Sequence, residues 1–179
     1  MALLKLARKA MNNFNLTAND IATYFVKKGV SPLQLQKLLY YSQVWYLKKF
    51  DRRLFSDDIK AWVFGPVVTS IWSKFKVVRR NETIAPFDHF YPCPTLLPQV
   101  VNDHLDNVWS SYGHLTGSQL VDLTHSELPW KMSRIGLLDN QPSDNIIVLN
   151  SATIKDYNLD LNGQIPYITS AKTLGYFSS

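Results

Sequence analysis

The segment that most constrains the fold is a run of twenty residues with the pattern of one long helix. It is SPLQLQKLLYYSQVWYLKKF, residues 31–50. Ser31 and Gln34 have the spacing of a capping box, and Pro32 falls at the first helical position, where its missing N–H costs nothing. One face carries a mostly apolar stripe over about three turns at helical spacing, and its members are Leu35, Leu38, Leu39, Ser42, Trp45 and Tyr46. The small Ser42 would let another helix approach closely. The pattern predicts a central core helix.

Further helices are predicted on either side of this segment. Thr17 is followed by Asp20 and later by Gly29, which predicts a capped helix over residues 18–28. Helical spacing or helix-start residues also occur in three later segments, which are residues 98–113, 115–125 and 128–134. Most of the chain is therefore expected to be helical.

The stretch AWVFGPVV, residues 61–68, breaks this helical period. Apolar residues alternate through 59–64, which predicts a short strand. Gly65 and Pro66 are interpreted as the N-cap and the first residue of a following helix. The buried face of that helix would carry Val67, Val68, Ile71, Trp72 and Phe75. The chain is thus expected to change from strand to helix at Gly65–Pro66.

The C-terminal part shows weaker patterns. Residues 146–150 are interpreted as extended, and Asn150 as the cap of a short helix that carries Ile154 and Tyr157. Alternation at 165–169 indicates a small strand.

Length and composition set the class of fold. The chain has 179 residues, of which 46% are hydrophobic and 13% aromatic, and this suits one domain with a single core. Residues 79–98 contain four prolines and no period, which predicts a loop. The prediction is a mainly α, compact single-domain helical bundle, with at most a small β element near residues 57–64 and in the C-terminal part.

Composition also restricts location and covalent chemistry. No run approaches the roughly 18 apolar residues of a membrane span, and the N-terminus lacks the features of a signal peptide. We expect a cytoplasmic protein with no membrane partner. Cys93 is the single cysteine, which excludes an internal disulfide and a metal site of several cysteines.

Charge is unevenly placed along the chain. Residues 1–80 carry 15 Lys and Arg against 4 Asp and Glu, whereas residues 81–179 carry 4 against 10. The basic first half suggests an acidic partner or a nucleic acid. The alternative is that the two halves face each other, or that the basic residues lie on solvated helix faces.

No catalytic constellation is found. His125 begins an H-x-E motif, but the P-C-x-x-C pair that zinc deaminases need downstream is absent. His104 and His114 stand ten and more residues away, and we interpret the histidines as surface or half-buried side chains rather than metal ligands. A G-x-S-x-G motif and a glycine-rich phosphate loop are missing too. We expect no enzyme, no catalytic residue, no cofactor and no metal.

Residues 21–41 imitate a helix-turn-helix DNA-binding motif. Gln34, Gln36 and Lys37 lie near the start of the second helix, and such side chains read bases. The second helix, however, is nearly twice the usual length of a recognition helix and carries a leucine and aromatic stripe. We therefore do not expect nucleic acid, and DNA binding stays an alternative.

Three segments, at 31–55, 59–76 and 115–134, together resemble the Panacea domain of antitoxins, the GepA or SocA-like phage-associated family. The matching positions are Pro32, Leu35 to Tyr40, Gln43, Trp45, Tyr46, Leu54, Phe55, Ala61, Trp62, Gly65, Pro66, Val67, Leu123 to His125, Pro129 and Trp130. The order and the spacing match. The resemblance covers residues 17–158, which leaves an N-terminal extension at 1–16 and a C-terminal extension at 159–179.

The resemblance implies a function in binding. Members are typically antitoxins that neutralise a cognate protein toxin by direct contact, and the basic half of this chain predicts an acidic surface on that toxin. The alternative is a protease adaptor or regulatory binding protein of prophage origin, with a protease as a further partner, followed by a DNA-binding regulator. With only about sixteen residues before the domain, an added DNA-binding domain is not expected.

Aromatic and turn residues of the three matching segments supply most of the candidate contact residues. Trp62 and Trp130 are the preferred anchors, because buried aromatic side chains dominate binding energy. Lys37 and His125 would add polar contacts near them, beside a groove at the Gly65–Pro66 turn. The full expected set of partner-binding residues is Lys37, Tyr41, Trp62, Gly65, Pro66, His125 and Trp130. Trp45 and Leu38 are expected in the core.

Overall fold

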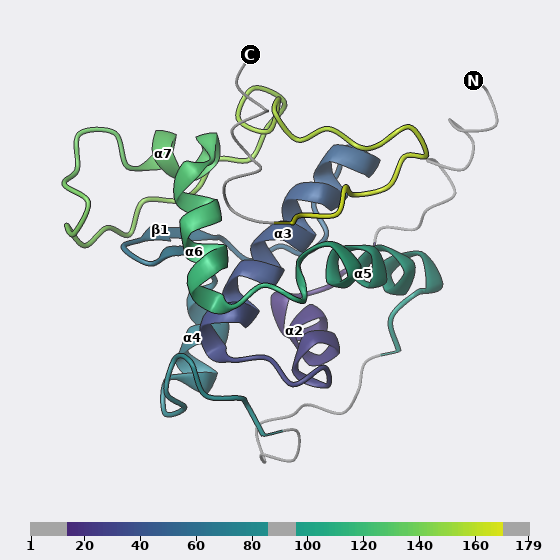
Figure 1. Cartoon of the computed structure of the whole chain (residues 1–179), viewed down its shortest axis with the longest axis horizontal. Helices are drawn as coiled ribbons and strands as arrows, with labels where there is room; N and C mark the ends of the chain where they lie inside the picture. The colour runs from purple at the N-terminus through teal and green to yellow at the C-terminus, as the bar shows by residue number, and fades with distance from the viewer. Residues whose placement is uncertain (1–13, 86–95, 170–179) are drawn as a thin grey trace.

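Helix α3, Pro32–Phe50, runs through the centre of the molecule, and the other elements pack around it (Figure 1). The computed structural model describes residues 14–85 and 96–169. Within them, the elements are α2 (Ala18–Val26), α3, β1 (Lys60–Trp62), β2 (Gly65–Val67), α4 (Thr69–Phe75), α5 (Gln99–Tyr112), α6 (Gly117–Ser126) and α7 (Leu128–Ser133). The predicted mainly α fold is confirmed, since this part of the chain holds six helices and one two-stranded sheet.

The predicted stripe of α3 is buried, and so is the opposite side of the helix. Every residue from Leu35 to Tyr46 is buried, including the polar Gln36, Lys37 and Gln43. In Figure 1, α2 and α5 lie on one side of α3, and α4, α6 and the strands lie on the other. A helix surrounded in this way is a core helix, as the sequence indicated, but with no solvent-facing side over its middle turns.

Local signals fix where the helices begin. The Ser31 hydroxyl accepts a hydrogen bond from the backbone N–H of Gln34 at 3.2 Å, and Pro32 starts α3 as predicted. The Thr17 backbone N–H donates to the Asp20 carboxylate at 2.8 Å at the start of α2. These bonds satisfy amide groups that the first turn of a helix leaves free.

The side chain of Gln43 holds the segment that leads from the end of α3 to β1. Its amide oxygen accepts from the backbone N–H groups of Leu54 and Phe55, at 2.9 and 3.2 Å, and its amide nitrogen donates to the Phe55 carbonyl at 3.1 Å. A buried glutamine thus holds the approach to β1 by three bonds.

The interpretation of Gly65–Pro66 as a helix start is wrong. Both residues lie in β2, which pairs antiparallel with β1, and α4 begins only at Thr69. The outer edge of β1 is occupied by the segment near Ile146, whereas β2 lies at the edge of the sheet. A proline is tolerated there because no neighbouring strand needs its missing N–H.

Three smaller predictions are also corrected. Trp72 is 42% exposed, because the short α4 turns Ile71 and Phe75 inward instead. Asn150 does accept from the N–H groups of residues 152 and 153, but turns rather than a helix follow it. The strand expected at 165–169 does not form. In the C-terminal part that is described, the β structure is limited to the bridge between Lys60 and Ile146.

Residues 159–169 pack against α5. The Asn107 side chain accepts from the Ile165 backbone N–H at 2.8 Å, and the Ser111 hydroxyl donates to the Ile165 carbonyl at 3.1 Å. Ile165 and Ile168 are buried in the common core. The predictions for residues 1–13, for the middle of the proline-rich loop with Cys93, and for residues 170–179 lie outside the described residues. Among the described helices, none combines the length and the apolarity that crossing a bilayer requires.

Candidate functional site

A tight hairpin positions the aromatic residues of the site. Val63 and Phe64 form the turn between β1 and β2, so the Phe64 ring stands at the tip and is 52% exposed. Gly65 follows with φ of +88°, a conformation that side chains with a Cβ rarely adopt. Trp62 precedes the turn, and its indole N–H donates to the Asp144 carboxylate at 3.0 Å.

Two polar side chains of α3 hold the hairpin from beneath. Lys37 donates from its Nζ to the Pro66 carbonyl at 2.9 Å, and Gln36 accepts from the backbone N–H of Val68 at 2.8 Å. Burial lowers the pKa of Lys37 from 10.5 to about 7. These contacts set the distance between the hairpin and the core helix.

A second support comes from α6 and α7. The Trp130 indole N–H donates to the Trp62 carbonyl at 3.0 Å, and the Arg134 guanidinium donates to the Ala61 carbonyl at 2.9 Å. His125 stacks on Trp130, with ring centroids 3.9 Å apart and an angle of 16° between the rings. The His125 Nε2 atom is buried without a hydrogen-bond partner, and burial, followed by the nearby Lys37, lowers the pKa of this imidazole.

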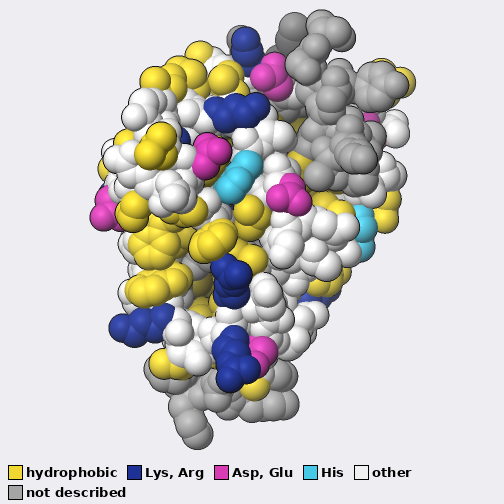
Figure 2. All heavy atoms as spheres, turned by 60° about the vertical axis from the view of Figure 1, so that its left-hand side comes forward, with side chains coloured by type: hydrophobic (Ala, Val, Ile, Leu, Met, Phe, Trp, Pro, Cys, Tyr) yellow, Lys and Arg dark blue, Asp and Glu magenta, His cyan; other side chains and the backbone are white. Residues whose placement is uncertain are grey.

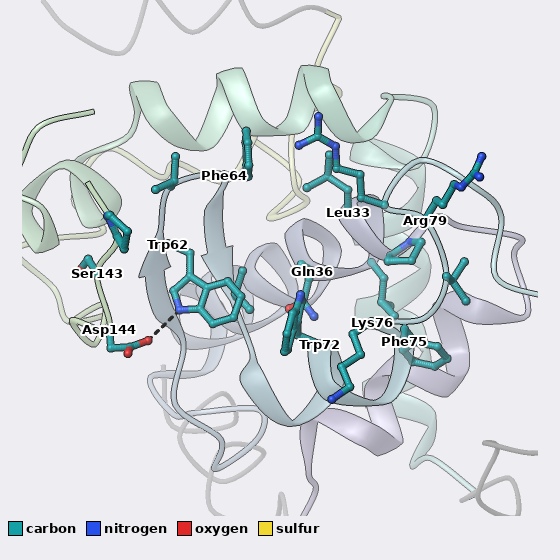
Figure 3. A pocket seen from close by; sticks show the side chains of 17 residues that line it. Leu33, Gln36, Trp62, Phe64, Trp72, Phe75, Lys76, Arg79, Ser143 and Asp144 are labelled. Atoms are coloured by element: carbon teal, nitrogen blue, oxygen red, sulfur yellow. Dashed lines mark hydrogen bonds between the residues drawn. The ribbon is translucent and has the colours of Figure 1, made fainter. Parts of the chain in front are cut away.

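Between the hairpin, α4 and the start of α3 lies a groove of about 900 Å³, which we call the hairpin groove. Its aromatic lining residues are Trp62, Phe64, Trp72 and Phe75. Figure 3 shows Trp62 and Trp72 side by side, and their rings meet edge to face at 5.2 Å. Exposed aromatic side chains over a fixed backbone are the usual anchors of protein interfaces.

Basic side chains surround these rings. Lys76, Arg79 and Arg80 line the groove, and Asp144 is the one carboxylate among its described lining residues. The Arg80 guanidinium lies 4.7 Å from the Phe64 ring centroid, a cation–π contact. Figure 2, which brings this side of the molecule forward, shows a patch of apolar side chains with Lys and Arg beside it. The groove therefore combines apolar area with positive charge.

The predicted site residues divide into three groups. Trp62 lines the groove itself. Gly65 and Pro66 belong to the hairpin itself, and behind it lie Lys37, His125 and Trp130. Tyr41 lies elsewhere, with its hydroxyl donating to Glu127 at 3.0 Å. Since Lys37, Tyr41, Gly65 and Pro66 are buried, in this conformation they position neighbouring groups rather than present a contact surface.

Sequence reasoning missed Phe64, Trp72 and the three basic residues of the groove. Phe64 gave no local signal, because its exposure follows from the two-residue turn between β1 and β2, which the sequence did not predict. Trp72 gave no signal either, since the direction in which its ring points depends on where α4 starts.

The inward-facing side chains of α3 contradict the helix-turn-helix alternative. The Gln34 amide donates to the carbonyls of Gly113 and Leu115, and both Gln36 and Lys37 are bonded to the hairpin. A helix with these side chains turned inward cannot read bases, so the helix-turn-helix interpretation is wrong.

Three histidines lie among the described residues, and His104 is buried instead of half-buried or exposed as expected. Burial lowers the pKa of His104 to about 4, and its Nε2 bonds the Ser42 carbonyl at 2.9 Å. His114 bonds the Ile168 carbonyl at 2.7 Å. Within residues 14–85 and 96–169, no group of three or more potential metal ligands exists.

Comparison with known proteins gives two matches. A family model described as "Antitoxin SocA-like, Panacea domain" matches residues 35–131, which run from the first turn of α3 to the middle of α7. The chain is also similar to a protein named Antitoxin SocA from Caulobacter vibrioides (strain NA1000 / CB15N), with 29% identity over 126 residues. The aligned region covers 65% of this chain and 64% of that protein, just under two thirds of its length. No solved structure matches the chain.

Proposed function

Because the chain belongs to the SocA-like Panacea family of antitoxins, we propose that it neutralises a cognate protein toxin by binding it directly in the hairpin groove. The observation that carries this proposal is the pair of exposed rings, Phe64 and Trp72, in a groove whose backbone is held from beneath by buried side chains. Rings fixed in this way lose little side-chain entropy when they are covered. The protein acts by binding and not by catalysis.

The chemistry of the groove defines the part of the toxin that fits. Trp62, Phe64 and Trp72 offer apolar area, whereas Lys76, Arg79 and Arg80 offer positive charge. A toxin segment with an apolar side chain flanked by Asp or Glu satisfies both. Charge complementarity therefore assigns an acidic, apolar segment to the groove.

Growth measurements test the proposal. The gene adjacent to this one is induced alone and together with this chain on a second plasmid. Direct neutralisation predicts growth arrest in the first case, restored growth in the second, and co-purification of the two proteins. A harmless neighbour, or toxicity that this chain does not relieve, contradicts the proposal.

The amount of toxin separates direct neutralisation from the protease-adaptor alternative. Neutralisation by binding leaves the toxin intact in a complex, so its level on a blot stays unchanged or rises in rescued cells. A toxin level that falls upon rescue, and recovers in a strain lacking the responsible protease, assigns the adaptor function instead.

A further inference from the structure

A second cavity, separate from the hairpin groove, lies where α3, α5, the α6–α7 junction and the C-terminal segment meet. Its volume is about 250 Å³. At about 30 Å³ for each water in the liquid, this is space for about eight waters, or for one small organic group. Trp45, Tyr112 and Tyr157 provide aromatic lining, and Glu127 provides a carboxylate.

The Glu127 carboxylate has neutral partners only. Its Oε1 accepts from the Tyr41 hydroxyl at 3.0 Å, and its Oε2 accepts from the Tyr157 hydroxyl at 2.5 Å. No Lys, Arg or His of the described chain forms an ion pair with it. The Tyr40 hydroxyl also hydrogen-bonds this carboxylate. An ionised carboxylate has about four acceptor positions, so about one remains after the bonds from the three tyrosines.

Other groups fix the aromatic lining in place. The Trp45 indole N–H donates to the Tyr112 hydroxyl at 2.9 Å, and the Tyr40 and Tyr157 hydroxyls lie 2.9 Å apart. Tyr41 stacks on Tyr112 with ring centroids 4.0 Å apart. The aromatic side chains are thus held before any ligand arrives.

The charges that face the cavity favour a cation. Glu127 and Asp156 are acidic, and Lys131 of α7 is the one basic residue among the described residues of the lining. From α3 and α5 the neighbouring ionisable groups are tyrosines only, namely Tyr40, Tyr41 and Tyr112. A carboxylate together with aromatic rings is the combination that recognises ammonium groups.

We propose that this cavity binds an organic ammonium group, which pairs with Glu127 and lies against the rings of Trp45, Tyr112 and Tyr157. The group comes from a free amine or from a lysine side chain of a protein, and the experiment below distinguishes these sources. The two carboxylates are too few for a metal site of protein ligands. The cavity shares no described lining residue with the hairpin groove.

Titration of the purified full chain tests the site. Choline, n-butylammonium and a blocked Gly-Lys-Gly peptide are added in turn, and the indole N–H signal of Trp45 is followed by NMR. The proposal predicts saturable shifts with at least one cation, whereas the neutral isostere of choline, 3,3-dimethylbutan-1-ol, binds much more weakly. Binding of the peptide assigns a protein lysine as the source, and binding of choline or n-butylammonium without the peptide assigns a free amine.

Variants identify the groups responsible. Glu127→Gln should weaken cation binding by about tenfold or more, because a buried charge pair loses one partner. The matched control Asp139→Asn, an exposed carboxylate outside the cavity, should leave binding unchanged. Lys131→Gln should tighten binding, since it removes the competing ammonium.

The unmodified protein gives an independent result if Glu127→Gln fails to fold. Burial raises the pKa of Glu127 to about 7, so this carboxyl becomes protonated as the pH falls below that value. Cation binding should weaken over the same range. Absence of saturable shifts with all three cations, or equal binding of the neutral isostere, overturns the proposal.

Discussion

At the start of β2, Gly65 combines a positive φ with a lack of space for a side chain. A Cβ at this position would lie 2.7 Å from the Thr124 Oγ1 and 2.8 Å from the Lys37 Cε. The hairpin can approach α3 and α6 only because this residue has no side chain. The glycine therefore serves packing as well as turn geometry.

Gly65→Ala should destabilise the protein by about 2 kcal/mol or more, because it adds an overpacked contact to backbone strain. Urea unfolding measures the loss. Gly136→Ala is the matched control, since Gly136 has φ of +82° with nothing within 4 Å of an added Cβ, and its loss should come from strain alone. Equal losses for the two variants would show that the contact with Lys37 and Thr124 does not matter.

Lys37 should make the stability of the protein depend on pH. Folding lowers its pKa from 10.5 to about 7, so between these values the unfolded chain holds a proton that the folded protein lacks. Stability contributed by this group therefore rises with pH across that window. Compared at about pH 7 and about pH 9.5 by urea unfolding, the stability of the wild type relative to Lys37→Met should increase. If the stability difference between the wild type and Lys37→Met did not change with pH, Lys37 would not be a buried, neutral amine in the folded protein.

At the scale of elements, the starts of α2 and α3 were predictable, whereas the hairpin and the start of α4 were not. The start of α3 follows from Ser31 and Pro32, which act within one turn of each other. The placement of Gly65 and Pro66 in β2 depends on Gln36 and on residues near Ile146, which are far away in sequence. Local turn chemistry allowed either outcome, and tertiary contacts selected the strand.

The candidate site shows the same division. Trp62 was predicted from its place in an alternating segment, but Trp72 and Arg80 join it only after α4 folds back beside the hairpin. The Glu127 cluster was missed because its partners, Tyr41 and Tyr157, lie 86 and 30 residues away. No periodicity connects side chains at such separations.

Arg134 links α7, β1 and the loop that carries Asp144. Its guanidinium donates to the carbonyls of residues 61, 138, 139 and 141. Arg134→Lys should destabilise the protein by about 2 kcal/mol, since one ammonium cannot bond the buried Ala61 carbonyl and the three loop carbonyls together. Arg79→Lys, at an exposed position, should change the melting temperature little. Similar melting temperatures for both variants would contradict this role.

At the scale of the whole molecule, part of the positive charge of the first half of the chain lies at one groove. Lys76, Arg79 and Arg80 all belong to that half, and all three line the hairpin groove. The affinity for an acidic toxin should therefore fall as salt rises, chiefly through slower association. Surface plasmon resonance at two salt concentrations measures this effect. It should shrink in Arg79→Gln/Arg80→Gln, and an unchanged salt dependence would place the acidic surface of the toxin elsewhere.

The affinity of Trp72→Ala for the toxin tests the central claim most directly. Trp72 is exposed and its loss should leave the fold intact, so the expected loss of binding, about 2 kcal/mol or about thirtyfold in Kd, reports on the groove itself. Leu161→Ala, an exposed apolar residue outside the groove, is the control and should bind as the wild type does. An unchanged Kd for a folded Trp72→Ala would contradict the hairpin groove as the toxin-binding site.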